Sequence, residues 1–140
     1  MRPSKLLALA LTLGLPTILS GCDPKINQCN RLIDVINGEQ DLIKTAASKN
    51  DVEGLKKLAE TFDEVGKKVD AVELKDEKLR GFRSDYKKMV DDLAKVSRDS
   101  AEAYETNDPA KSEDAEKKMS KFTARENELV NSINEYCQGG

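Results

Sequence analysis

Apolar residues recur at alternating spacings of three and four along four successive stretches of this chain, and that spacing constrains its fold most. Residues three and four apart lie on one face of an α-helix, so each stretch is predicted to be an amphipathic helix. The most regular stretch contains Leu55, Leu58, Phe62, Val65, Val69 and Val72. No stretch alternates apolar and polar residues with period two, the pattern of a half-buried strand. The sequence therefore predicts an all-α fold.

The sequence also indicates where the helices begin. Asp23 precedes Pro24 and Asp108 precedes Pro109, and an acidic N-cap followed by proline at the first helical position is a favoured start. Asp76 is the expected N-cap of the third helix. The predicted helices cover about residues 24–48, 51–73, 77–106 and 109–137. Four amphipathic helices with short connections favour an antiparallel up-down-up-down four-helix bundle.

The first 22 residues have the organisation of a secretory signal. Arg2 and Lys5 precede an apolar segment, residues 6–19, which is too short to cross a bilayer as a helix. The segment closes with Leu19-Ser20-Gly21-Cys22, which resembles the lipobox of a bacterial lipoprotein precursor. An alternative is an ordinary cleaved signal followed by a free cysteine.

The lipobox resemblance implies that residues 1–21 are a cleaved signal peptide and that Cys22 is the lipidated first residue of the mature protein. Residues 22–140 then form a single domain. Two or three acyl chains such as palmitate would hold this domain permanently at a membrane, facing the periplasm or the cell exterior. Asp23 resembles the signal that retains lipoproteins in the inner membrane of enteric bacteria.

Two further cysteines, Cys29 and Cys137, form an even pair in what would be an oxidising compartment. In an up-down-up-down bundle the first helix begins where the last one ends, so these two residues should lie side by side. An open three-helix array would not bring them together. We therefore expect a bundle stapled by one disulfide between Cys29 and Cys137.

The expected disulfide also serves as a register mark for the first and last helices. Gln40 follows Cys29 at the same sequence separation at which Glu126 precedes Cys137. Both interrupt otherwise apolar faces, so we expect them to face each other as a buried polar pair that fixes the register. The alternative for this pair is a ligand or proton site.

The helix lengths predict that one end of the bundle protrudes. Counting from the disulfide, residues 100–118, which we call the tip, should extend about 10–15 Å beyond the first two helices at 1.5 Å per residue. Tyr104 is its one large apolar side chain. Tyr104, Asn107 and Asp108 are the expected contacts of a partner; the alternative is a solvated hairpin with no role.

Charge and residue types argue against several classes of function. The chain has a net charge of −3, and without Arg2 and Lys5 it has 21 basic and 26 acidic residues, a net of −5. This does not suit a nucleic-acid binder. The absence of histidine excludes imidazole metal sites and histidine-based catalytic triads, so we expect no metal, no cofactor and no enzymatic activity.

These observations favour a membrane-anchored lipoprotein that acts as a structural or protein-interaction module. Its expected partners are the membrane, through the N-terminal lipid, and another protein of the cell envelope. The alternative is a carrier or sensor that binds a small apolar ligand between the helices. The sequence leaves the oligomeric state open.

Overall fold

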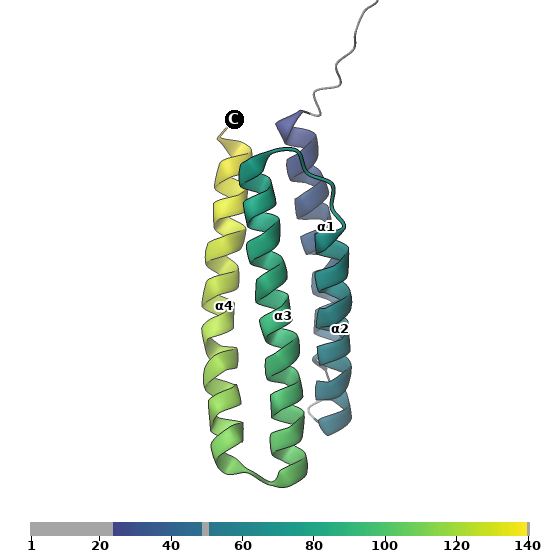
Figure 1. The fold of residues 1–140 in the computed structure, drawn as a ribbon, viewed down its shortest axis with the longest axis vertical. Coiled ribbons are helices and arrows are strands. Elements are labelled where there is room, and N and C mark those ends of the chain that lie inside the picture. Colours follow the sequence, from purple (N-terminus) through teal and green to yellow (C-terminus); the bar gives the residue numbers. More distant parts are fainter. Residues whose placement is uncertain (1–23, 49–50, 140) are drawn as a thin grey trace, which may run out of the picture.

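The computed structural model describes residues 24–48 and 51–139 (Figure 1). Within this part the chain forms helices and no strands: α1 (Lys25–Ala46), α2 (Val52–Asp70), α3 (Glu77–Thr106) and α4 (Pro109–Gln138). The all-α prediction is confirmed. The predicted signal peptide and Cys22 lie outside the described residues. None of the described helices is both long and apolar enough to span a membrane.

The ion pairs between neighbouring helices show that the bundle is antiparallel. Near the α3–α4 turn Glu102 pairs with Lys111 at 2.7 Å, and farther from it Asp92 pairs with Arg125 at 3.2 Å. Moving back along α3 therefore means moving forward along α4. Figure 1 shows the same alternation for α1 with α2 and for α2 with α3. The predicted four-helix bundle is confirmed.

On α2 and α3 the core follows the apolar faces that the sequence predicts. Its fully or nearly fully buried side chains include Leu32, Ile36, Leu58, Phe62, Val65, Val69, Leu79, Phe82, Tyr86, Met89, Leu93 and Ile133. Most of them come from α2 and α3, which lie at the centre of the packing. A Cβ at Gly66 would lie 2.9 Å from Asp91 Oδ1, so the glycine lets these two helices approach closely. On α4 the apolar residues Met119, Phe122 and Leu129 are only partly buried.

Aspartate side chains begin three of the four described helices. Asp51 accepts a hydrogen bond from Gly54 N at 2.7 Å, and Asp76 accepts one from Leu79 N at 2.9 Å. Asp108 caps α4 in the same way. α1 differs, because Pro24 occupies its N-cap position and provides no side-chain bond. The sequence had placed Pro24 one position later, inside the helix; Asp23, the expected cap, lies outside the described residues.

α2 ends at Asp70, three residues before its predicted end. The following residues, 71–76, which we call the connection, run on to the start of α3 (Figure 1). The buried Gln28 on α1 accepts hydrogen bonds through Oε1 from the backbone N–H of Lys75 at 2.7 Å and of Asp76 at 2.9 Å. Gln28 thus provides a hydrogen-bond acceptor for two backbone N–H groups of the connection, which lie outside the helices.

Two arginines hold the same connection through its carbonyl groups. Arg31 Nη2 donates to Glu73 O at 3.1 Å, and Arg83 Nη1 donates to Val72 O at 2.8 Å. These bonds from α1 and α3 compensate for the helical hydrogen bonds that the connection does not make. The early end of α2 is therefore a consequence of tertiary contacts.

The early end of α2 also changes the predicted overhang. The connection continues past the end of α2, away from the tip, before α3 begins (Figure 1). As a result the last turns of α3 lie beside the first turns of α2, where Lys56 pairs with Glu105 at 2.6 Å. The neighbouring Ala101 and Ala103 are buried, so this part of α3 packs in the bundle instead of projecting from it. The α3–α4 turn still lies beyond the first two helices (Figure 1), but the predicted overhang was too long.

Candidate functional site

The disulfide defines one end of the molecule, which we call the stapled end. Cys29 in the second turn of α1 is bonded to Cys137 in the last turn of α4, with their Cα atoms 5.8 Å apart. The predicted disulfide is therefore present. The start of α1, the connection and the end of α4 all lie at this end (Figure 1). A group attached to the chain just before α1 would therefore be carried at the stapled end.

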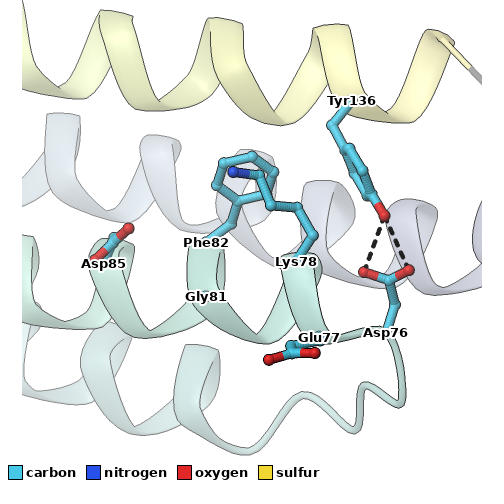
Figure 2. Close-up of a pocket in the computed structure, with 7 residues that line it drawn as sticks. All are labelled: Asp76, Glu77, Lys78, Gly81, Phe82, Asp85 and Tyr136. Atoms are coloured by element: carbon cyan, nitrogen blue, oxygen red, sulfur yellow. Dashed lines mark hydrogen bonds between the residues drawn. The ribbon is translucent and has the colours of Figure 1, made fainter.

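A second set of contacts ties the helices together at the stapled end (Figure 2). Tyr136 Oη on α4 donates to both carboxylate oxygens of Asp76, at 3.0 and 3.2 Å. The Nζ of Lys25 on α1 lies 3.9 Å from the centroid of the Tyr136 ring, within cation–π distance. Phe82 packs edge-on against the same ring, with centroids 5.8 Å apart. Residues from α1, the connection and α3 thus converge on Tyr136 of α4.

These contacts change the acidity of both members of the pair. The N–H of Leu79 lowers the pKa of the Asp76 carboxyl, and the Tyr136 hydroxyl and the Lys25 ammonium lower it further. The hydrogen bond to the Asp76 carboxylate raises the pKa of Tyr136. The capping role of Asp76 was visible in the sequence, but its partner on the last helix was not. An open surface pocket of about 500 Å³ adjoins the pair, with Lys78 and Asp85 on its rim (Figure 2).

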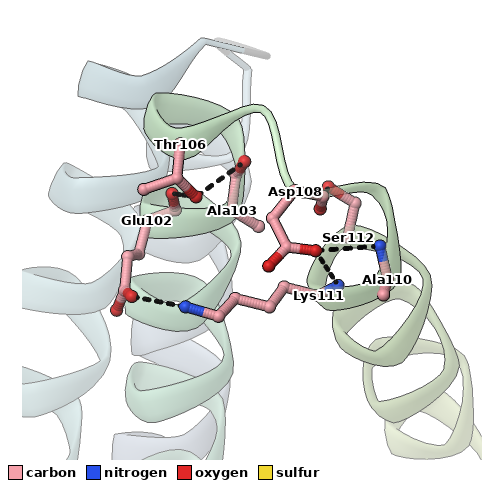
Figure 3. Close-up of polar contacts among 7 residues, drawn as sticks. All are labelled: Glu102, Ala103, Thr106, Asp108, Ala110, Lys111 and Ser112. Atoms are coloured by element: carbon pink, nitrogen blue, oxygen red, sulfur yellow. Dashed lines mark hydrogen bonds and ion pairs between the residues drawn. The ribbon is translucent and has the colours of Figure 1, made fainter.

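The opposite end of the bundle is the tip (Figure 3), and its turn is built from two residues that the sequence had suggested as partner contacts. Asn107 ends α3 in the left-handed conformation, with φ 50°, which asparagine tolerates well. Asp108 accepts hydrogen bonds from the backbone N–H of Ala110 and Lys111, both at 3.1 Å. Asn107 and Asp108 therefore shape the turn.

Tyr104, the third suggested contact, is available at the surface. Its exposed fraction of 58% is the highest among the large hydrophobic side chains of the described residues. The ion pair between Lys111 and Glu102, which lies two residues before Tyr104 in the sequence, joins α3 to α4 (Figure 3). The tip thus presents one exposed aromatic ring on a braced helical hairpin.

A partly open pocket of about 200 Å³ lies between the helices, and all four of them contribute to its lining. Ile43, Phe62 and Met89 give it apolar walls, and Tyr86 and Glu126 add a phenol and a carboxyl group. Burial raises the pKa of Glu126. Burial also raises the pKa of Tyr86, and the negative charges of Glu126 and of Glu39 on α1 add to that shift. This is a small, mostly apolar space with two weakly acidic groups.

The structure describes both members of the predicted polar pair. Gln40 and Glu126 are each partly buried, and no hydrogen bond between these two described residues is found. Their direct contact stays a prediction. The neighbouring Glu39 is the buried acidic residue of α1, 7% exposed, and Lys68 on α2 donates to it at 3.0 and 3.2 Å. The spacing of apolar residues did not predict that Glu39 is buried, because its burial depends on the face of α1 that packs against α2.

Within residues 24–48 and 51–139, no three acidic or sulfur ligands lie close enough together to hold a metal ion. A family model described as "Uncharacterised lipoprotein PM1805" matches residues 30–138. The match begins beyond Cys22, so it is independent of the lipobox resemblance. No curated protein and no solved structure matches the chain.

Proposed function

The chain belongs to the family described as uncharacterised lipoprotein PM1805, and from this premise we propose that it is a non-catalytic module that docks an envelope protein at its tip. The family supports a lipid-anchored location in the cell envelope. We further propose that Cys22 carries the acyl chains, that the domain faces the periplasm or the exterior, and that Asp23 favours the inner membrane.

The observation that carries this proposal is the separation of the two ends. The start of α1, where a lipid anchor would attach, lies at the stapled end, and the α3–α4 turn lies at the other (Figure 1). α3 and α4 each have 30 residues, which corresponds to about 45 Å at 1.5 Å per residue. An anchored bundle of this shape can present its tip well away from the membrane surface.

The chemistry of the tip supports a docking role. Tyrosine is enriched at the centres of protein interfaces because it combines a large ring with a hydrogen-bonding hydroxyl. Tyr104 provides such a group, and the ion pairs of Glu102 with Lys111 and of Lys56 with Glu105 brace the helices around it. A braced surface loses little conformational entropy on binding.

Site-specific photo-crosslinking in intact cells tests the docking role. A photoreactive phenylalanine analogue in place of Tyr104 should capture one defined envelope protein. The same analogue in place of Asp41, an exposed residue on α1, serves as the control. Capture at Asp41 with none at Tyr104 would refute the tip as the docking site.

The pocket between the helices favours a second candidate, a carrier for a small ligand. Its apolar walls and the partly buried Glu126 suit a compact apolar molecule with one polar group. Native mass spectrometry of protein purified from its own membranes should then show a bound small molecule. Ala47→Phe, which places a ring at the pocket, should remove it, whereas Ala124→Phe on the exposed side of α4 should not. A spectrum of ligand-free protein alone would count against the carrier.

A further inference from the structure

A basic groove lies beside the connection at the stapled end. It has a volume of about 1020 Å³, and α1, α2, the connection and α3 all line it. Five of its lining residues are basic and two are acidic, on a chain whose net charge is −3. The basic residues are Arg31, Lys68, Lys75, Arg80 and Arg83. Positive charge is thus concentrated on one surface of an acidic protein.

The five basic residues divide into two groups by their contacts. Arg31 and Arg83 bind carbonyl groups of the connection, and Lys68 pairs with the buried Glu39. Lys75 and Arg80 are exposed and have no ion-pair partner among the residues that the structure describes. The first group fixes the shape of the groove, and the second leaves two cations available to a ligand.

The position of the groove relates it to the membrane. The backbone of Lys75 is hydrogen-bonded to Gln28, which is six residues after Cys22. Even fully extended, six residues span only about 20 Å. A lipid attached at Cys22 therefore keeps the groove close to the headgroups of the same membrane.

We infer that the basic groove binds the phosphodiester headgroups of anionic phospholipids and thereby fixes the orientation of the bundle on its membrane. Lys75 and Arg80 provide the charge, and the arginine adds the planar hydrogen-bonding geometry that matches a phosphate. Free phosphate compounds share this chemistry, but lipid headgroups are the anions that the anchor holds next to the groove. The inference rests on lipid anchoring and is independent of a docking role for the tip.

A single tryptophan can report on the groove, because the chain has none of its own. Ala71→Trp places the reporter at an exposed position in the groove, and Ala110→Trp places a control at the tip. The full lipidated protein is inserted into nanodiscs of phosphatidylcholine, with or without phosphatidylglycerol, that contain a nitroxide on the headgroup. Phosphatidylglycerol should increase quenching of the tryptophan at position 71 and leave that at position 110 unchanged.

The charge dependence is tested in the Ala71→Trp background. Each basic residue near an anionic surface changes partitioning by about five-fold, so Lys75→Gln with Arg80→Gln should lower the bound-to-free ratio about 25-fold. Quenching should then fall to the level in phosphatidylcholine alone. Lys88→Gln with Lys121→Gln removes the same charge from exposed positions outside the groove and should have no effect. Helical circular dichroism checks that each variant is folded.

Three results would overturn the inference. One is equal quenching at position 71 in the two lipid compositions. Another is unchanged quenching after neutralisation of Lys75 and Arg80. The third is an emission change in phosphatidylcholine nanodiscs on adding soluble glycerol 3-phosphate, which would identify a site for free anions. None of these results bears on photo-crosslinking at Tyr104, so the two proposals fail separately.

Discussion

At the scale of the residue, Cys22 is the position that we propose to carry the lipid anchor. We expect the protein in the membrane fraction to begin at Cys22 with diacylglyceryl and acyl groups, and Cys22→Ser to abolish the modification. Mass spectrometry of the purified protein measures both masses. An unmodified mature N-terminus at Cys22 in the wild-type membrane fraction would contradict the assignment.

Glu126 is the residue whose burial should oppose folding. Because burial raises its pKa in the folded state, the penalty is absent at low pH, develops as pH rises through the carboxyl range, and is complete above the raised pKa. Glu126→Gln should therefore raise the melting temperature at neutral pH, with a gain that shrinks on acidification. Thermal denaturation at several pH values measures this. A lower melting temperature at neutral pH would show that the carboxylate is satisfied, as a contact with Gln40 predicts.

At the scale of the element, Asp76 joins the start of α3 to the end of α4. It caps α3 through Leu79 N and accepts the hydroxyl of Tyr136, so Asp76→Ala should lower the melting temperature more than Tyr136→Phe does. Asp51→Ala, which removes a cap without a cross-helix bond, is the matched control and should cost about 1 kcal/mol.

The effect of Asp76 should depend on pH. Its folded-state pKa is lowered, so its stabilisation is present above the usual carboxyl pKa and is lost as pH falls through the lowered one. The difference in melting temperature between the wild type and Asp76→Ala should therefore shrink in strong acid. A difference that stays constant across this range would show that the charge of Asp76 is not what stabilises the fold.

At the scale of the whole molecule, the disulfide closes nearly the entire domain into one loop. Cys29 and Cys137 are separated by 108 positions in the sequence, and on the chain-entropy model such a loop contributes about 4–5 kcal/mol at most. The double variant with alanine at both positions should lower the melting temperature by several degrees or more. Alanine is preferable to serine because Cys29 is fully buried. A melting temperature equal to that of the oxidised wild type would contradict this role.

The sequence alone determined the parts of this protein that depend on local spacing. The bounds of α3 agree with the prediction, and those of α4 differ by one residue, because the caps Asp76 and Asp108 act within a single turn. The disulfide was also predictable, since topology alone places the start of the first helix beside the end of the last. Tyr104 was recognisable as a large side chain in a polar stretch.

Only the tertiary structure decided the features that depend on the rotation of each helix about its axis relative to its neighbours. α2 ends early because Gln28 on α1 and Arg83 on α3 bind the connection, which in turn shortens the overhang of the tip. The basic groove is assembled by the same packing from residues far apart in the sequence. Helical periodicity specifies which face of a helix is buried, but not which neighbour that face meets. That choice comes from the mutual fit of the helices, and it places Glu39 against Lys68.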